Sequence, residues 1–127
     1  MKRKFPNVNG TYLKSEIITS KAFWDLNGSA IKVFMVFRMK CRFGKKNIGK
    51  RETDSIINNG EITFTYQEAR KNYGIGKSTF LRARDMLIEV GLIEISENGG
   101  EHHPNKYAIS NNWMKYPEKK FTRPKSS

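Results

Sequence analysis

The chain has 127 residues, 37% hydrophobic and 28% charged, so we expect one domain with a buried core, not a two-domain enzyme. Its longest apolar stretch, residues 33–37, is far too short to span a membrane, and its single cysteine, Cys41, excludes an internal disulfide framework and a cysteine-based zinc site. With 24 Lys and Arg against 12 Asp and Glu, the net charge of +12 favours a polyanionic partner, either nucleic acid or an acidic membrane surface.

Residues 1–21 mix Lys, Asn, Gly, Thr and Pro with weak periodicity, which predicts a basic N-terminal arm with at most a short extended piece. The start is basic but leads into Pro6 and Asn7 instead of an apolar run, so we expect no secretory signal and a cytoplasmic protein. Ser20 is a candidate N-cap for a brief helix through Leu26, with Phe23 and Trp24 as its candidate buried residues.

Residues 30–43 show the apolar spacing of one helix face, at positions 30, 33, 34, 37 and 41. Gly44 is suited to follow the end of that helix. A basic run overlaps its last turns, because the chain from Arg38 to Arg51 holds seven basic residues and no acidic one. The rest of this run lies in a predicted polar loop over residues 43–60.

The second half begins with a turn at Asn58-Asn59-Gly60 and a short predicted strand over residues 61–64. Thr65 and Glu68 form a candidate capping box, which predicts a helix over 66–73 with Ala69 and Tyr73 facing inward. A turn over residues 74–76 then separates this helix from a longer one over 77–90.

The helix predicted over 77–90 places four apolar residues on one face: Phe80, Ala83, Leu87 and Val90. Strands are predicted over 92–96 and 106–110, joined by a loop that contains Asn98-Gly99-Gly100 and Pro104. Residues 114–127 form a predicted basic C-terminal tail.

A short helix, a tight turn, an amphipathic helix and a hairpin together resemble a winged helix-turn-helix DNA-binding domain. The resemblance rests on residues 58–113, which include NNGEITFTYQEARKNYGIGKSTFLRARDMLIEVGLIEIS and NKYAISNNW, and on residues 22–43, AFWDLNGSAIKVFMVFRMKCRF. Similar segments occur in small winged-helix proteins of phages, plasmids and integrated elements. The resemblance implies an α+β, mainly α fold over residues 22–113, with a three-helix core, a short strand and a C-terminal β-hairpin wing.

The same resemblance implies sequence-specific binding to double-stranded DNA, in replication initiation or transcriptional regulation of a mobile element. The resemblance also implies that the protein is cytoplasmic and associated with the nucleoid, and that it can form a homodimer. With the apolar face inward, the opposite face of the 77–90 helix presents candidate base-reading residues at its N-terminal end. These are Lys77, Ser78, Thr79 and Arg82. A bidentate contact from Arg82 to guanine would contribute about 1–3 kcal/mol of discrimination.

Candidate phosphate contacts lie outside that helix face, and such contacts position a protein without reading sequence. They are Lys45, Lys46, Lys50, Arg51, Lys71 and Arg84. The predicted wing offers further contacts to the minor groove or backbone, from His102, His103, Asn105 and Lys106. Its tip also carries Glu97 and Glu101, so the wing is not basic.

Several chemistries are not expected. Residues 74–79, GIGKST, resemble a phosphate-binding P-loop, but the position that needs the first glycine is Lys71. His102 and His103 are adjacent and diverge on an extended strand, so we expect no metal site, and nothing indicates a catalytic constellation, a cofactor or a small-molecule ligand. A protein-interaction module within a larger assembly and RNA binding are the alternatives to binding duplex DNA.

Overall fold

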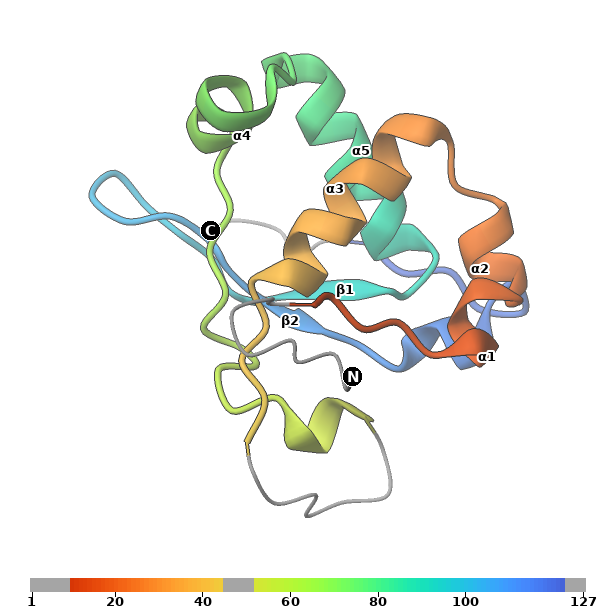
Figure 1. The fold of residues 1–127 in the computed structure, drawn as a ribbon. Coiled ribbons are helices and arrows are strands. Elements are labelled where there is room, and N and C mark those ends of the chain that lie inside the picture. The colour runs from red at the N-terminus through yellow and green to blue at the C-terminus, as the bar shows by residue number, and fades with distance from the viewer. Residues whose placement is uncertain (1–9, 45–51, 123–127) are drawn as a thin grey trace, which may run out of the picture.

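The computed structural model describes residues 10–44 and 52–122 and has an α+β, mainly helical fold with an antiparallel hairpin, which confirms the predicted α+β, mainly α composition. Figure 1 shows the elements, which follow in chain order: α1 (Ser15–Ile18), α2 (Lys21–Trp24), α3 (Gly28–Met39), the 3-10 helix η1 (Glu52–Ser55), α4 (Tyr66–Tyr73), α5 (Lys77–Glu89), β1 (Ile93–Glu97), β2 (Lys106–Ile109) and the 3-10 helix η2 (Asn112–Lys115). No helix in the described part of the chain is both long enough and apolar enough to cross a bilayer.

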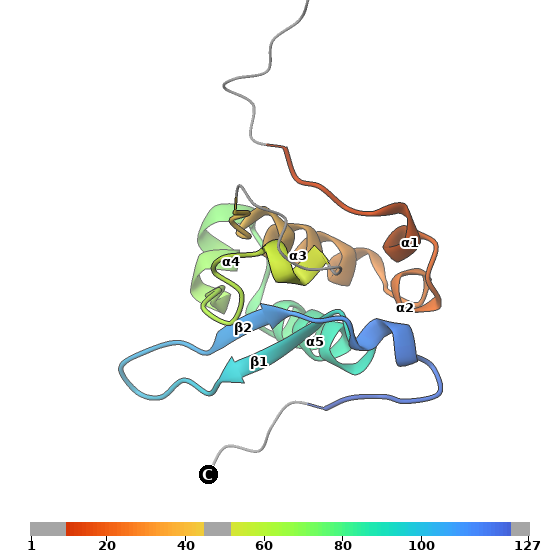
Figure 2. The ribbon, with the colours of Figure 1, turned by 90° about the horizontal axis from the view of Figure 1, so that it is seen from below.

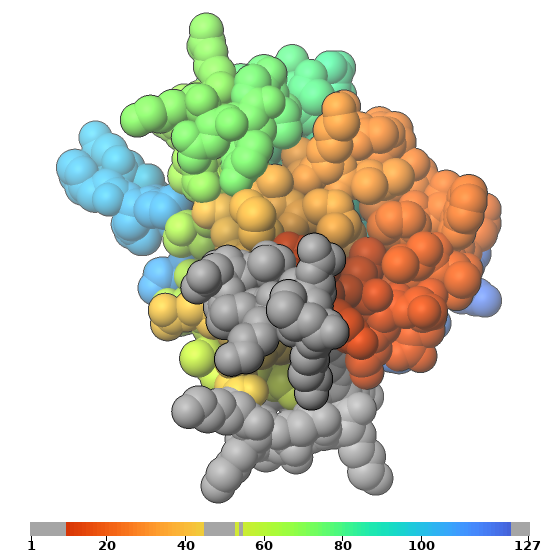
Figure 3. All heavy atoms as spheres, viewed as in Figure 1, coloured from red at the N-terminus to blue at the C-terminus, as the bar shows by residue number. Residues whose placement is uncertain are grey.

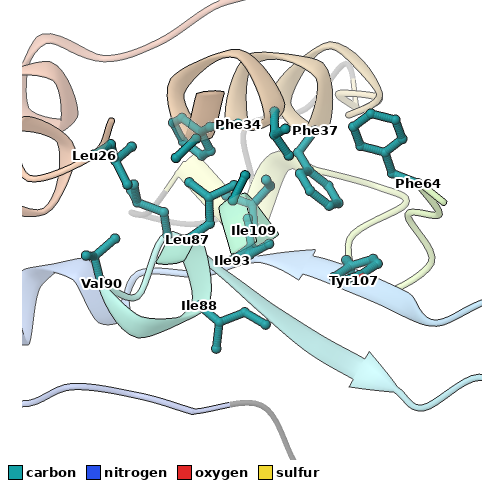
Figure 4. Packing of buried hydrophobic residues seen from close by; sticks show 14 of the residues in the cluster. Leu26, Phe34, Phe37, Phe64, Leu87, Ile88, Val90, Ile93, Tyr107 and Ile109 are labelled. Atoms are coloured by element: carbon teal, nitrogen blue, oxygen red, sulfur yellow. The ribbon is translucent and has the colours of Figure 1, made fainter. Parts of the chain in front are cut away.

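Helices α3 and α5 pack against each other and against the antiparallel hairpin of β1 and β2, while α4 extends from the far end of α5 (Figures 1 and 2). The core lies between these elements (Figure 4). Phe37 of α3 meets Tyr107 of β2 edge to face, with 4.9 Å between ring centroids, and Phe64 meets Phe80 of α5 at the same distance. The four residues predicted to form the apolar face of the 77–90 helix are all buried.

Helix α3 begins and ends earlier than the predicted span of 30–43. Asn27 caps it, since its Oδ1 accepts a hydrogen bond from the Ala30 N–H at 2.8 Å. The helix ends at Met39, and Gly44 is therefore not its C-terminal glycine. The chain beyond Met39 leaves the helix because Phe43 forms a β-bridge with Ile56.

That bridge also changes the predicted 43–60 loop. Residues 52–55 form η1, Ile56 is buried in the core, and the Asn58 side chain bonds the backbone of Lys40 and Arg42. The strand predicted over 61–64 is reduced to a single bridge between Ile62 and Tyr107.

The helix pair agrees closely with the sequence. Helix α4 covers the predicted 66–73, and the Thr65 hydroxyl accepts from the Glu68 N–H at 3.1 Å, as a capping box requires. The Glu68 carboxylate, however, pairs with Lys40, the C-cap residue of α3, at 2.6 Å. Gly74 ends α4 in the left-handed conformation, φ 68°, which favours glycine, and α5 starts at Lys77 as predicted.

Both terminal segments pack on the domain more closely than an arm and a tail would. Within the predicted arm 1–21, the described part contains α1, whose Ile17 is buried. Ser20 caps α2 as predicted, but the Trp24 side chain is 73% exposed. Within the predicted tail 114–127, the Tyr116 hydroxyl donates to Asp25 at 2.6 Å and the Phe121 N–H donates to the Glu89 carbonyl at 3.1 Å.

Candidate nucleic-acid interface

A group of exposed cations lies across α4, the turn 74–76 and the start of α5. Arg70 and Lys71 come from the last turn of α4, and Lys77 and Arg82 from the first half of α5. No described residue forms an ion pair with any of these four side chains. We call them, with Ser78 and Thr79, the α4–α5 face. A charge without a partner can bind a phosphate or a base without first breaking an existing ion pair.

The acidic side chains near this face are neutralised by other cations. The Glu68 carboxylate binds Lys40 at 2.6 Å, and Asp85 accepts from Arg84 at 3.0 Å. Because each carboxylate has its own basic partner, neither offsets the charge of the four exposed cations. On the α4–α5 face, four exposed cations therefore lie beside carboxylates that are already paired.

The first turn of α5 holds three of the four predicted base-reading residues. Gly76 is its N-cap and gives no side-chain cap, so the first backbone N–H groups of α5 have no capping oxygen. The Lys77 Nζ lies 4.4 Å from the centre of the Tyr66 ring, a cation–π contact that places it at the start of both helices. Ser78 is exposed and Thr79 half-buried, so the structure brings the predicted residues together at the exposed end of one helix.

Arg84, predicted to contact phosphate, is placed differently from Arg82. Its residue is 6% exposed, and its Nε and Nη2 both donate to Asp85 Oδ1, at 3.1 and 3.0 Å. Burial alone would lower the pKa of the guanidinium, but interactions with Tyr107 and Asp85 raise the pKa above its ordinary value. The side chain therefore serves packing and does not belong to the exposed cations.

The predicted wing contacts are partly engaged within the hairpin. Asn105 Oδ1 accepts from the Gly99 N–H at 2.5 Å and closes the loop. Lys106 binds Glu61 at 3.0 Å and lies 3.9 Å from Glu97, and the hydrogen bond with Glu61 is the main cause that raises the pKa of Lys106.

The tip of the hairpin remains exposed. His102 lies 4.0 Å from the carboxylate of Glu101, and His103 is exposed beside it. Glu94 on β1 is also exposed. Lys106, the one Lys or Arg between residues 93 and 109, is already paired, whereas Glu94 and Glu101 have no Lys or Arg partner among the described residues.

A groove of about 510 Å³ separates the hairpin tip from the helix pair. Figure 3 shows the hairpin standing away from the body beside α4. The walls of the groove are Thr65, Tyr66 and Gln67 at the start of α4, Leu81 and Arg84 of α5, and residues 99–105 of the hairpin. The groove thus marks the boundary between a positive helix pair and a negative hairpin.

Much of the charge predicted to bind phosphate lies outside the described residues. The residues outside the described ranges include nine of the 24 Lys and Arg and none of the 12 Asp and Glu, and four of these nine are Lys45, Lys46, Lys50 and Arg51. Of the described members of the basic run, Arg38 is buried and donates to the Tyr12 carbonyl at 2.6 Å. Lys40 is paired with Glu68, and Arg42 is exposed.

Sequence reasoning missed Arg70, which extends the α4–α5 face beside Lys71. The polar face of the helix predicted over 66–73 could have indicated it, since positions 70 and 71 both lie in its last turn. It also missed Lys32, an exposed cation on α3 that lines a hollow next to the 74–76 turn.

No protein family model matches this chain, and neither a curated protein nor a solved structure matches it. In the described ranges, no three His, Cys, Asp or Glu residues gather in a way that could hold a metal ion.

Proposed function

We propose that this chain is a winged helix-turn-helix domain that binds double-stranded DNA. The observation that carries the proposal is the α4–α5 face, whose four cations are exposed and unpaired among the described residues. The order of elements supports it. Helix α3, the bridge at Ile62, α4, a three-residue turn, α5 and the β1–β2 hairpin follow the arrangement of a winged helix.

In this proposal the N-terminal half of α5 enters the major groove, which is wide enough for a helix. Lys77 and Arg82 are donors suited to the acceptors of guanine, and Ser78 can bond to several bases. Arg70 and Lys71, on the neighbouring helix, bind phosphates at the edge of the groove and fix the orientation of α5. Specific recognition of a DNA site suits replication initiation or transcriptional regulation.

The hairpin contributes little to DNA binding in this proposal. Its exposed Glu94 and Glu101 have no Lys or Arg partner in the part of the chain that the structure describes, and Lys106 is held by Glu61. A phosphate backbone close to these carboxylates would be repelled. Affinity therefore depends on the helix pair and not on the wing.

The test is a fluorescence-anisotropy titration of the full chain against random-sequence duplex DNA at several salt concentrations, with single-stranded RNA in parallel. We expect micromolar duplex binding that weakens steeply as salt rises, because the cations displace counterions from the phosphates. No duplex binding at low salt would overturn the proposal. Binding to RNA alone would then indicate an RNA-binding protein, and binding to neither a protein-interaction module.

A double variant assigns the binding to the α4–α5 face. Lys77→Ala/Arg82→Ala should weaken duplex binding by roughly 10-fold and leave the melting temperature nearly unchanged, since both side chains are exposed. The matched control is Lys115→Ala/Lys119→Ala, which removes the same charge near η2, beyond the opposite end of α5. Equal losses in the two double variants would show that net charge, and not this face, determines binding.

A further inference from the structure

We propose that a hollow between α3 and the 74–76 turn binds one sugar–phosphate unit of the DNA backbone. This inference rests on the proposed function and adds a second contact to it. The hollow measures about 450 Å³. Helix α3 lines it with Ser29, Lys32 and Val36, and the opposite wall is formed by residues 73–76 and Thr79.

The polar part of the hollow suits a phosphate. Ser29 and Lys32 are three residues apart on α3, so they lie on the same helix face, and Thr79 approaches from α5. Lys32 is exposed and has no ion pair with any residue that the structure describes. One ammonium and two hydroxyls from two separate helices can donate to the same phosphate oxygens, and the charge strengthens these hydrogen bonds.

The remaining wall is apolar, which distinguishes a nucleotide backbone from a free anion. Val36 and Ile75 are half-buried, and the Tyr73 side chain, predicted to face inward, is 42% exposed at the hollow. A deoxyribose offers carbon-bound hydrogens that pack on such a wall, whereas inorganic phosphate offers none. The combination of the two walls therefore fits a sugar with its phosphate.

Gly76 stands at the mouth of this hollow without a structural reason to be glycine. Its backbone is in the extended region, φ −69° and ψ 158°, which any residue adopts, and a Cβ there would meet no atom within 4 Å. As N-cap of α5, a Ser or Asp would satisfy an otherwise uncapped N–H and would stabilise the helix at least as well. Glycine at this position leaves the hollow and the first amides of α5 open to a ligand.

The hollow also has a suitable position relative to the α4–α5 face. Thr79 belongs to both, and Lys77 lies two residues before it at the start of the same helix. The groove beside the hairpin shares no lining residue with the hollow, so the two lie on different sides of α5. A DNA strand that borders the major groove can thus rest on the α3 side while α5 reads the bases.

The first test measures duplex affinity against salt for Lys32→Ala and for the control Lys115→Ala. We expect Lys32→Ala to weaken binding by roughly 3- to 10-fold and to reduce the salt slope by about 0.9, the value for one lost phosphate contact. The order of preference among duplex sequences should not change, because a phosphate contact carries no sequence information. The control should match the wild type.

The outcomes separate this inference from the proposed function. Wild-type duplex binding with an unchanged affinity and slope in Lys32→Ala would overturn the sugar–phosphate contact and leave the proposed function intact. Absence of duplex binding in the wild type would overturn both. If inorganic phosphate at constant ionic strength binds the wild type but not Lys32→Ala, the hollow is a site for a free anion, and the sugar–phosphate assignment is wrong.

A second pair of variants uses the helix cap and does not depend on removing a lysine. Gly76→Asp should keep or raise the melting temperature, because aspartate is a good N-cap, yet weaken duplex binding by at least roughly 10-fold through repulsion of the phosphate. Gly76→Ser gives a similar cap without charge and should stay within about 3-fold of the wild type. Equal affinities for the Asp and Ser variants would contradict a phosphate at this mouth.

Discussion

The helix pair and the hairpin both contribute residues to the core, and both carry several charged side chains on their exposed surfaces, but the contacts of these charges differ. On α4 and α5 the cations Arg70, Lys71, Lys77 and Arg82 are exposed, and no described residue forms an ion pair with them. In the hairpin the cation Lys106 lies between Glu61 and Glu97. The partners of a charge, more than its presence, therefore decide which surface can attract a polyanion.

Two arginines of α5, Arg82 and Arg84, show the same dependence on partners. Arg82 points to solvent, whereas Arg84 is 6% exposed and bonded to Asp85 through two nitrogens. Two arginines of the same helix thus differ in burial and in hydrogen bonding. One is available to a ligand, and the other supports the packing of α5 against Tyr107 of β2.

The largest expected effect comes from reversing charge on the two regions. Lys77→Glu/Arg82→Glu should weaken duplex binding by roughly 100-fold or more at low salt, because it replaces attraction of phosphates by repulsion. Glu94→Lys/Glu101→Lys on the hairpin should strengthen binding by no more than about 3-fold. Anisotropy titrations of both variants at one salt concentration measure the difference.

These variants change the net charge by the same amount in opposite directions, so a purely global charge effect predicts shifts of similar size. Such a symmetric result would remove the distinction between the regions. Circular dichroism spectra like that of the wild type would exclude unfolding as the cause of a loss.

A smaller effect should separate Arg82 from Arg84. Arg84→Met keeps the apolar stem but removes the hydrogen bonds to Asp85, and we expect it to lower the free energy of unfolding by about 1–3 kcal/mol. Arg82→Met should change stability by less than about 0.5 kcal/mol and weaken duplex binding several-fold. Urea unfolding and anisotropy on both variants give the two numbers. Loss of binding without loss of stability in Arg84→Met would return Arg84 to the interface.

The sequence predicted the helix pair well because its signals are local. Thr65 caps α4, Gly74 ends it in the left-handed conformation, and apolar residues of the 77–90 helix repeat with the helical period. Each of these signals depends on residues a few positions apart, and the structure confirms the elements that they predict.

The elements that the sequence misplaced depend on distant partners. Helix α3 was predicted to continue to residue 43, but Phe43 pairs with Ile56, and the chain leaves the helix before that bridge. The strand expected over 61–64 is one bridge to Tyr107, 45 positions further along the chain from Ile62. Helical periodicity carries no information about such contacts.

In the candidate site, too, the features set by local sequence could be predicted, and those set by distant residues could not. The local pattern predicts that Lys77, Ser78, Thr79 and Arg82 lie on one helix, and the structure places all four in α5, with Thr79 half-buried and the other three exposed. Whether a cation is engaged depends partly on distant residues, because Arg84 interacts with Tyr107 as well as with the adjacent Asp85, and Lys106 is paired with Glu61. The contacts with Tyr107 and Glu61 could not be predicted from the local sequence.

The smallest expected effect concerns Lys106 and tests whether its charge is used within the hairpin. Lys106→Gln should leave duplex affinity within about 2-fold of the wild type and lower the melting temperature slightly at neutral pH. The hydrogen bond with Glu61 raises the pKa of Lys106 above its ordinary value of 10.5 in the folded protein. Its stabilising contribution is therefore fully present below pH 10.5 and is lost as the pH rises through the folded-state pKa.

Thermal unfolding of the wild type and of Lys106→Gln at pH 8 and at pH values above 10.5 checks this sign. The difference between the two melting temperatures should be fully present at pH 8 and should shrink at the higher values, since the wild-type lysine then loses its charge. A constant difference across this range would mean that the ion pairs do not stabilise the hairpin. If Lys106→Gln instead weakened duplex binding as much as Lys77→Ala does, paired and unpaired cations would be equivalent, and the contrast between hairpin and helix pair would no longer explain where DNA binds.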